Sequence, residues 1–214
     1  ALAQTTKTGL TFLLNRETGE PIFPIEEKEV PQGAIEGDYV SKTQPFPTKP
    51  APLNPIYFDP EKAFGFTFWD RGHCKRTAKK LRNEGLFTPP SLQGSIHYPS
   101  GVGGNNWGGP AVDADRNIMV VNTNNMASLI VMIPREDCKK PLEELSINKN
   151  QVRFTNIESN EGAPYCNLRS MGFFSPLGVP CTEPPWGTLT AIDLNNGEHL
   201  WNVPLGTSKD LAPF

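Results

Sequence analysis

The most regular pattern of apolar and polar positions lies in residues 101–135, which read GVGGNNWGGPAVDADRNIMVVNTNNMASLIVMIPR. Two apolar runs, at 118–121 and 129–133, are rich in Val, Ile and Met and too short for helices, which favours strands. Turn-forming residues precede the first run, and an Asn-rich stretch separates the two. The pattern predicts strand, turn, strand, short loop and strand, arranged as a tight antiparallel meander. The glycines and asparagines around Trp107 indicate that the backbone there approaches something flat.

A second, shorter pattern occurs near both ends of the chain. Residues 8–23 read TGLTFLLNRETGEPIF, and residues 188–201 read TLTAIDLNNGEHLW. When the two are superposed, three pairs of positions coincide: Asn15 with Asp193, Gly19 with Gly197, and Phe23 with Trp201. Each copy predicts an apolar strand, a turn closed by glycine and a return strand, which in the first copy are 10–14, 15–19 and 21–23. Such hairpins bury little apolar surface alone, so repeated copies stack with the aromatic residue as the wedge between neighbours; two unrelated hairpins are the alternative.

Between these patterns, residues 26–100 show little regular alternation. Prolines at 45, 47, 50, 52, 55 and 60 exclude a helix or a central strand there, which predicts an ordered insertion. Residues 69–86 are its helical candidate, with Asp70 as the cap and Gly85 at the end. One face of this helix would carry Cys74, Ala78 and Leu81. Its six Lys and Arg residues are typical of a solvated face, with a nucleic-acid or lipid patch as the alternative.

Composition narrows the class of protein. The chain has 214 residues, 37% of them hydrophobic, which is enough for a core, and its 22 prolines and 19 glycines favour short strands joined by long ordered loops. A net charge of -3 gives no general attraction to nucleic acid or anionic lipid. The sequence contains no apolar run of membrane-spanning length. Its start, ALAQTTKTGL, enters a strand pattern almost at once, so we expect a chain cut from a longer protein.

Several residues suggest a metal-binding or redox motif, but their spacing does not match one. Asp113 and Asp115 lack the glycine and distal glutamate of a calcium loop, so a turn is predicted there. His73, His97 and His199 form no metal-binding pair, and loop or surface positions are expected for them. The four cysteines fit neither a metal knuckle nor a redox motif, and they allow three pairings.

Longer motifs point to a family. AIDLNNGEHLW, at 191–201, resembles the tryptophan-docking motif of quinoprotein dehydrogenases, whose eight four-stranded blades are locked by such tryptophans. Three further stretches resemble the membrane-bound dehydrogenases for glucose, quinate and shikimate that depend on pyrroloquinoline quinone (PQQ): QTTKTGLTFLLNRETGEPIFP, FTPPSLQGSIHYPSGVGGNNWGGPAVDADRN and FFSPLGVPCTEPPWGTLTAIDL. The resemblance covers nearly the whole chain.

The resemblance implies an all-β fold: about three blades from the second half of an eight-bladed β-propeller, with four-stranded antiparallel blades, a long Pro-rich insertion and one short helix. A single partial propeller domain is expected over 1–214. Its parts would be a blade hairpin at 1–25, the insertion at 26–100, a central blade at 101–135, a loop at 136–180 and a last blade at 181–214.

The resemblance also implies a site. Lys7, in TTKTG, matches the basic residue that hydrogen-bonds the quinone oxygens of PQQ, where a cation stabilises negative charge as hydride arrives. Asn106 and Trp107 match an Asn-Trp pair that lines the cofactor cavity, and Asn122 is a weaker alternate. An exposed loop lysine, a turn-forming asparagine and a packing tryptophan are the purely structural alternatives. The family's catalytic carboxylate and the ligands of its calcium or magnesium ion are expected outside this chain, so no catalytic or metal-binding residue is assigned within it.

The family works in the oxidising periplasm, and its glucose-type members have cysteines that match Cys74 and Cys181. The resemblance therefore implies a Cys74–Cys181 disulfide, which leaves Cys138 to pair with Cys166; reduced, buried cysteines are the alternative.

The whole protein is expected to oxidise a sugar or a cyclic polyol acid, either glucose or quinate/shikimate, and to pass electrons through PQQ to membrane ubiquinone. It would lie in the periplasm, anchored to the inner membrane by a segment not present here, and the 214-residue chain alone would be inactive. Its open blade edges would join the rest of the propeller or self-associate. The alternative is a non-catalytic propeller that scaffolds outer-membrane protein assembly, which would need neither Lys7 nor the glycine-rich approach to Asn106.

Overall fold

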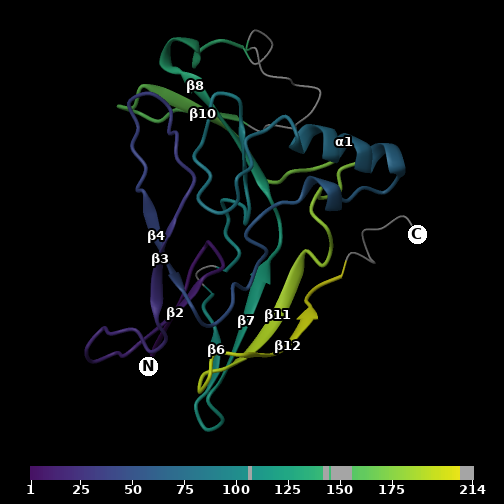
Figure 1. Ribbon diagram of the computed structural model, residues 1–214. Coiled ribbons are helices and arrows are strands. Elements are labelled where there is room, and N and C mark those ends of the chain that lie inside the picture. The colour runs from purple at the N-terminus through teal and green to yellow at the C-terminus, as the bar shows by residue number, and fades with distance from the viewer. Residues whose placement is uncertain (106–107, 142–144, 146–155, 208–214) are drawn as a thin grey trace.

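The computed structural model describes residues 1–105, 108–141, 145 and 156–207, where the regular secondary structure is mostly antiparallel strands joined by long loops (Figure 1). Two sheets have four strands each. The first has the order β12-β11-β7-β6, formed by His199–Pro204, Gly187–Asp193, Ile118–Asn124 and Ala111–Asp113. The second has the order β5-β8-β10-β9, formed by Ser95–His97, Ser128–Pro134, Tyr165–Ser170 and Asn156–Glu158.

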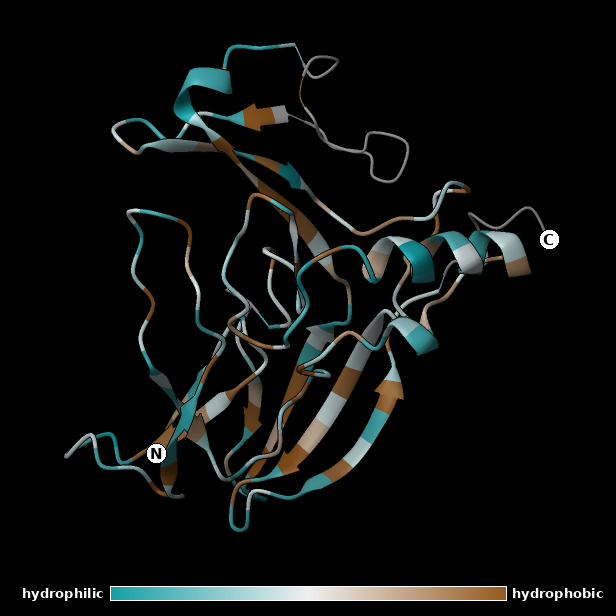
Figure 2. Ribbon diagram, turned by 45° about the horizontal axis from the view of Figure 1, so that its top comes forward, coloured by the Kyte–Doolittle hydropathy of each residue, from teal (hydrophilic) through white to brown (hydrophobic). Residues whose placement is uncertain are grey.

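Smaller elements lie beside these sheets. The first pair of strands is β1 (Leu2–Thr5) with β2 (Thr11–Leu14), and the second is β3 (Ile25–Glu29) with β4 (Thr43–Pro47). Two short 3-10 helices, Pro60–Lys62 and Arg135–Asp137, are labelled η1 and η2. Figure 2 shows bands of apolar residues along the longer strands and mostly polar or neutral residues on the helix. Among the described residues no helix is both long and apolar enough to cross a membrane.

The predicted meander at 101–135 is wrong in one respect. The turn between β6 and β7 is present, but β7 pairs with β11, whereas β8 pairs with β5 and β10 in the other sheet. A tight hairpin between β7 and β8 requires positive φ angles, and residues 125–127 have none. The Asn125 N–H instead donates to the carbonyl of Trp186, at 2.8 Å, so the chain leaves the first sheet at that point.

The predicted repeat is confirmed in its turns. In each copy the glycine N–H donates to the carbonyl four residues earlier, Gly19 to Asn15 and Gly197 to Asp193, both at 2.8 Å. Both glycines have left-handed backbone, with φ of +77° at Gly19 and +73° at Gly197, which favours residues without a Cβ. The side-chain oxygens of Asn15 and Asp193 each accept an N–H two residues on.

The first copy has no return strand at 21–23. Pro21 has no N–H to donate, and only an isolated bridge joins it to Leu14. Strand β2 pairs instead with β1, which precedes it. Phe23, the aromatic residue of the first copy, nevertheless packs on the turn of the second, because a Cβ placed on Gly197 would lie 3.1 Å from its Cε2. Trp201, the aromatic residue of the second copy, is exposed.

The helix is shorter than predicted. Helix α1 covers Phe68–Ala78, and its N-cap is Thr67, whose Oγ1 accepts the Asp70 N–H at 3.2 Å. The buried Asp70 carboxylate accepts the N–H groups of Phe66 and Leu177, so it fastens the helix to a distant loop and does not cap it. The helix ends seven residues before Gly85, because the chain turns there and Arg82 exchanges backbone hydrogen bonds with the start of β5.

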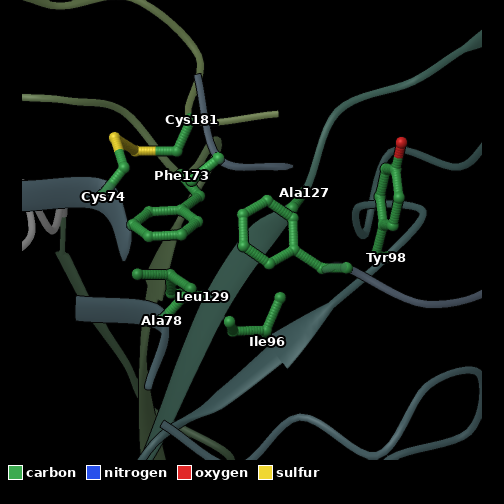
Figure 3. Close-up of a cluster of buried hydrophobic side chains, with 10 residues drawn as sticks. Cys74, Ala78, Ile96, Tyr98, Ala127, Leu129, Phe173 and Cys181 are labelled. Atoms are coloured by element: carbon green, nitrogen blue, oxygen red, sulfur yellow. A yellow bond between two sulfur atoms is a disulfide. The ribbon is translucent and has the colours of Figure 1, made fainter. Parts of the chain in front are cut away.

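A buried cluster joins the helix to the second sheet (Figure 3). The ring of Phe173 lies beside the disulfide between Cys74 and Cys181, both of which are fully buried. The second disulfide, Cys138–Cys166, lies in a separate cluster under the second sheet. Both pairings that the resemblance implied are therefore confirmed.

Candidate functional site

Lys7 lies in the turn between β1 and β2, against the glycine-rich segment that starts at Gly101. Its Nζ donates to the carbonyl of Gly101 at 3.3 Å, and its own carbonyl accepts the Gly104 N–H at 2.8 Å. Gly103 is in the left-handed region, with φ of +96°, and a Cβ there would lie 2.8 Å from the Cγ of Lys7. Gly103 thus allows the backbone to lie directly on the Lys7 side chain, which restricts the Cβ and Cγ atoms of the lysine.

The same segment packs against a buried asparagine that sequence reasoning missed. A Cβ on Gly104 would lie 2.1 Å from the Oδ1 of Asn54, and one on Gly9 would lie 2.5 Å from that oxygen. Asn54 Nδ2 donates to the carbonyl of Asn124 and to the Oδ1 of Asn125, at 2.8 and 2.6 Å. The close approach expected from the glycine content is therefore explained by Lys7 and Asn54. Asn54 lies in the Pro-rich insertion, where no periodicity marked it.

The structure brings together only part of the predicted site. Asn106 and Trp107 lie outside the described residues, but the preceding Asn105 is buried and donates from Nδ2 to the carbonyl of Asn122 at 2.8 Å. Asn122 itself lies in β7 with an exposed side chain, and it lines neither of the hollows that adjoin Lys7. Lys7 is thus held next to the segment that leads to Asn106, whereas the side chain of Asn122 is not part of this arrangement.

Two hollows meet at Lys7 and Gly101. The larger, about 430 Å³, lies between the β1–β2 turn and the insertion, and among its lining residues are Gln44, Thr88, His97 and Tyr98. The smaller, about 240 Å³, lies toward the second sheet and includes Arg169 of β10. Lys7 is therefore the one cation shared by both hollows, among the residues that the structure describes.

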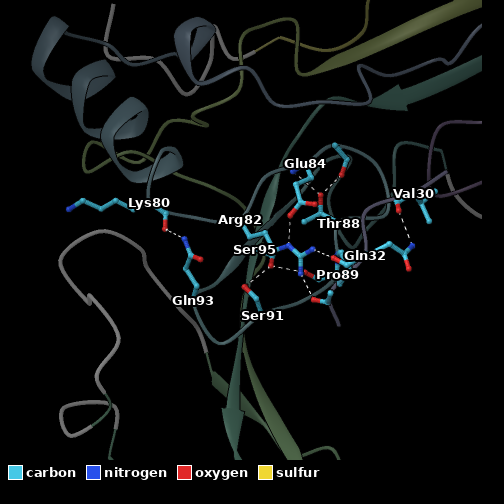
Figure 4. A network of polar contacts seen from close by, with 12 residues as sticks. Val30, Gln32, Lys80, Arg82, Glu84, Thr88, Pro89, Ser91, Gln93 and Ser95 are labelled. Carbon is cyan, nitrogen blue, oxygen red and sulfur yellow. Dashed lines mark hydrogen bonds and ion pairs between the residues drawn. The ribbon is translucent and has the colours of Figure 1, made fainter. Parts of the chain in front are cut away.

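A polar network holds one wall of the larger hollow (Figure 4). The guanidinium of Arg82 donates to the carbonyls of Gln32 and Gly33 and pairs with Glu84. Gln32 in turn donates from Nε2 to the carbonyl of Val30 at 2.9 Å. Val30 lines the hollow, so Arg82 couples the 30–33 segment to the region around β5.

Burial keeps two lining residues of the larger hollow uncharged. Desolvation lowers the pKa of His97, so its neutral form is favoured. Burial, with a smaller contribution from the charge of Glu183, raises the pKa of Tyr98 to about 12. The expectation that His97 lies in a surface loop is wrong: it ends strand β5, an edge strand that pairs with β8, and it lines this hollow.

No group of three or more His, Cys, Asp or Glu residues close enough to hold a metal occurs in the described part of the chain. Asp113 forms the turn predicted for it, since its Oδ1 accepts the N–H groups of Asp115 and Arg116 at 3.2 and 3.1 Å.

Open four-stranded antiparallel sheets, together with an aromatic wedge between repeated turns, define this chain as part of a β-propeller. Comparison with known families agrees: the family described as "Glucose/ethanol/alcohol dehydrogenase, beta-propeller domain", labelled PQQ, matches residues 1–214. The chain belongs to this family, which confirms the resemblance.

Individual proteins similar to this chain are also dehydrogenases. The chain is 37% identical over 214 residues to quinoprotein glucose dehydrogenase of Escherichia coli (strain K12), covering 97% of this chain and 26% of that protein. It is 33% identical to quinate/shikimate dehydrogenase (quinone) of Acinetobacter baylyi, covering 98% and 26%. It is 31% identical to the glycerol dehydrogenase large subunit of Gluconobacter thailandicus, covering 100% and 30%. The chain thus spans between a quarter and a third of the length of these relatives.

The residues around Lys7 fit the cofactor that the family name implies. PQQ is a planar quinone that carries carboxylates, so a cation beside open space is compatible with it. The Lys7 ammonium lies where two hollows meet, and Gly101 leaves open the space that a Cβ would fill, whereas Gly103 lies directly on the Lys7 side chain. Among the described residues, Lys7 is the predicted site residue whose position fits such a group.

Proposed function

We propose that the chain forms one wall of the PQQ cavity in a dehydrogenase that oxidises a CH–OH group of a sugar or polyol. The observation that carries this proposal is the placement of Lys7 by the 101–104 segment at the meeting point of two hollows, in a chain that belongs to the PQQ propeller family. Glucose and quinate or shikimate are the substrates that its relatives' names suggest.

PQQ, when bound, supplies an electron-accepting quinone. The residues of this chain would hold the group in position and stabilise the charge that develops on it. Lys7 would place a positive charge near the acceptor, and such a preorganised charge would stabilise negative charge that develops there. The hydrogen bond from its Nζ to Gly101 and the close packing of Gly103 reduce the number of conformations that the side chain visits. Asn54 and Asn105 fix the 101–105 segment to the end of β7, so the position of Lys7 depends on buried amides at some distance from it.

The rest of the proposal concerns the whole protein. We place it in the periplasm, anchored to the inner membrane by a segment outside this chain, with ubiquinone as the electron acceptor and a calcium or magnesium ion bound mainly by residues outside this chain. The oxidising compartment is supported by the two disulfides, because structural disulfides persist in such compartments. The 214-residue chain alone holds only part of the cavity, so we expect no turnover from it with glucose or quinate.

Replacement of Lys7 by Ala in the intact protein tests the proposal. Lys7 is exposed, so its truncation should change the free energy of unfolding by no more than about 0.5 kcal/mol. Turnover with saturating PQQ should fall by about 100-fold, the usual cost of removing one preorganised donor. Lys80→Ala, at another exposed lysine after α1, is the matched control and should keep full turnover.

Activity near that of the unmodified protein, together with a lower melting temperature, would show that Lys7 is a structural residue. Full-length protein that binds no PQQ at all would instead favour the non-catalytic scaffold.

A further inference from the structure

The smaller hollow beside Lys7 has a cationic lining. Its described lining residues include two charged side chains, Lys7 and Arg169, and both are basic; the others are Gly101, Val102, Ser128, Ser170 and Met171. The chain as a whole carries a net charge of -3, so the charge of this lining is opposite in sign to that of the chain. A concave site lined by charge of one sign attracts ligands of the opposite sign.

Gly101 is the point at which the two cations approach each other. The Nζ of Lys7 donates to its carbonyl at 3.3 Å, and the Nη1 of Arg169 lies 3.8 Å from the position of a Cβ on this glycine. The lysine comes from the β1–β2 turn and the arginine from β10, so only the fold brings them together. Any residue with a Cβ at position 101 would place its side chain in contact with the guanidinium of Arg169. Glycine leaves the space beside the guanidinium open.

The guanidinium of Arg169 is oriented by a neighbouring strand. Its Nη2 donates to Oε1 of Glu158 in β9 at 2.7 Å, and Glu158 is not among the residues that line the hollow. The carboxylate therefore fixes the plane of the guanidinium from behind, while the Nη1 side lies toward Gly101. Arg169 is half-buried, with 41% of its side chain exposed, so a ligand there would meet a partly desolvated cation. Guanidinium groups bind carboxylates through paired hydrogen bonds, which a lysine cannot reproduce.

We propose that this hollow is a carboxylate-binding subsite, with Arg169 as its recognition residue and Lys7 as the cation it shares with the quinone contact. The subsite extends the proposed function and rests on it, since it assigns a position to the anionic end of a ligand bound at Lys7. The carboxylate could belong to the cofactor or to a polyol-acid substrate, which have the same chemistry here.

The test measures binding by the full-length protein without PQQ, and it does not depend on turnover. Side-chain NMR signals of Arg169, assigned by comparison with Arg169→Gln, are followed during titration with three probes at low ionic strength: PQQ, shikimate and the neutral methyl ester of shikimate. The acids should shift the Arg169 Nε–H signal, and the ester should not. Arg169→Gln should weaken binding of the acids by about tenfold or more, since the charge-assisted bonds are lost.

Arg116→Gln is the matched control. It removes the same charge from an exposed arginine that also forms an ion pair, with Asp113, in the other sheet, and it should leave affinity within about twofold of the unmodified chain. If Arg169→Gln does not fold, as judged by circular dichroism, Lys7→Gln tests the other side of the hollow and should also weaken binding of the acids. Shifts with PQQ alone assign the subsite to the cofactor, and shifts with shikimate assign it to the substrate; both support it.

Three results would overturn the subsite: an ester that binds as well as the acid, an Arg169→Gln variant as tight as Arg116→Gln, or no response of Arg169 to either acid. These results are independent of the dehydrogenase test. Carboxylate binding in a protein without dehydrogenase activity would refute the proposed function and leave the subsite standing, and full activity without carboxylate binding would do the reverse.

Discussion

The packing of Phe23 on the turn at Gly197 predicts that two chemically identical substitutions have different costs. Gly19 and Gly197 close equivalent turns with nearly equal φ angles, +77° and +73°. A Cβ on Gly19 would meet nothing within 4 Å, whereas a Cβ on Gly197 would lie 2.8 Å from Lys49 Cβ and 3.1 Å from Phe23 Cε2. Gly19→Ala therefore measures backbone strain alone, and Gly197→Ala adds the contact between repeats.

The magnitudes follow from these two contributions. Alanine in the left-handed region costs about 1–2 kcal/mol, which both variants share. Overpacking of a tight contact costs a further 1–3 kcal/mol, roughly, which only Gly197→Ala incurs. The free energy of unfolding, from urea titration followed by circular dichroism, should fall by about 1–2 kcal/mol for Gly19→Ala and by about 2–5 kcal/mol for Gly197→Ala.

A double-mutant cycle identifies the contact. Phe23→Ala removes the ring that the new methyl group meets, so in combination with Gly197→Ala the losses should be less than additive, with a coupling of about 0.5–3 kcal/mol. With Gly19→Ala the same ring removal should be additive. Equal costs for the two glycine variants, or additive behaviour at Gly197, would refute the inference that Phe23 wedges the repeats together.

Three further predictions concern the disulfides, the ion pairs of Glu61 and the sheet edge. The Cys74–Cys181 and Cys138–Cys166 bonds span 107 and 28 residues, so in urea titrations the paired alanine variants should lose about 5 and about 3.5 kcal/mol, and the reverse order would contradict a loop-entropy origin. Hydrogen bonds from Lys75 and Lys79 lower the pKa of Glu61 to about 2, so the ionised carboxylate stabilises the folded state fully above pH 4.5 and less as the pH falls toward 2. Carboxyl NMR titration should show this pKa, and the pKa should rise if both lysines are replaced by Ala. Strand β12 is exposed along its whole length, so light scattering should show association that increases with concentration, and a monomer throughout would contradict an adhesive edge.

The sequence could predict features encoded by short-range chemistry. The turns at Asn15 and Asp193 depend on an oxygen acceptor and a left-handed glycine within five residues, so their pattern was visible in the letters. The propeller class and both disulfides came from the resemblance, because pairing over 107 residues leaves no local signal.

Sequence reasoning failed where identical local patterns have different partners. The apolar runs of β7 and β8 alternate in the same way, and only the hydrogen bonds of Asn125 to residues 185 and 186 send them into separate sheets. Arg169 was missed for a related reason: a single arginine in a strand has no motif, and its neighbours Lys7 and Gly101 are remote in the chain. Asn54 likewise gains its role from two distant glycines.

Residues 125–186 form a detour whose two ends touch. β7 pairs with β11 as if a short turn joined them, with Asn124 opposite Gly187, and the N–H of Asn125 reaches the carbonyl of Trp186 immediately beyond this pair. The pairing of β7 with β11 therefore places no requirement on the length of residues 125–186. The segment is fixed instead by other contacts, since β8 pairs with β5 and Cys181 is bonded to Cys74. The Cys138–Cys166 bond joins two residues of the detour, so this disulfide stabilises the detour without a link to any other part of the chain.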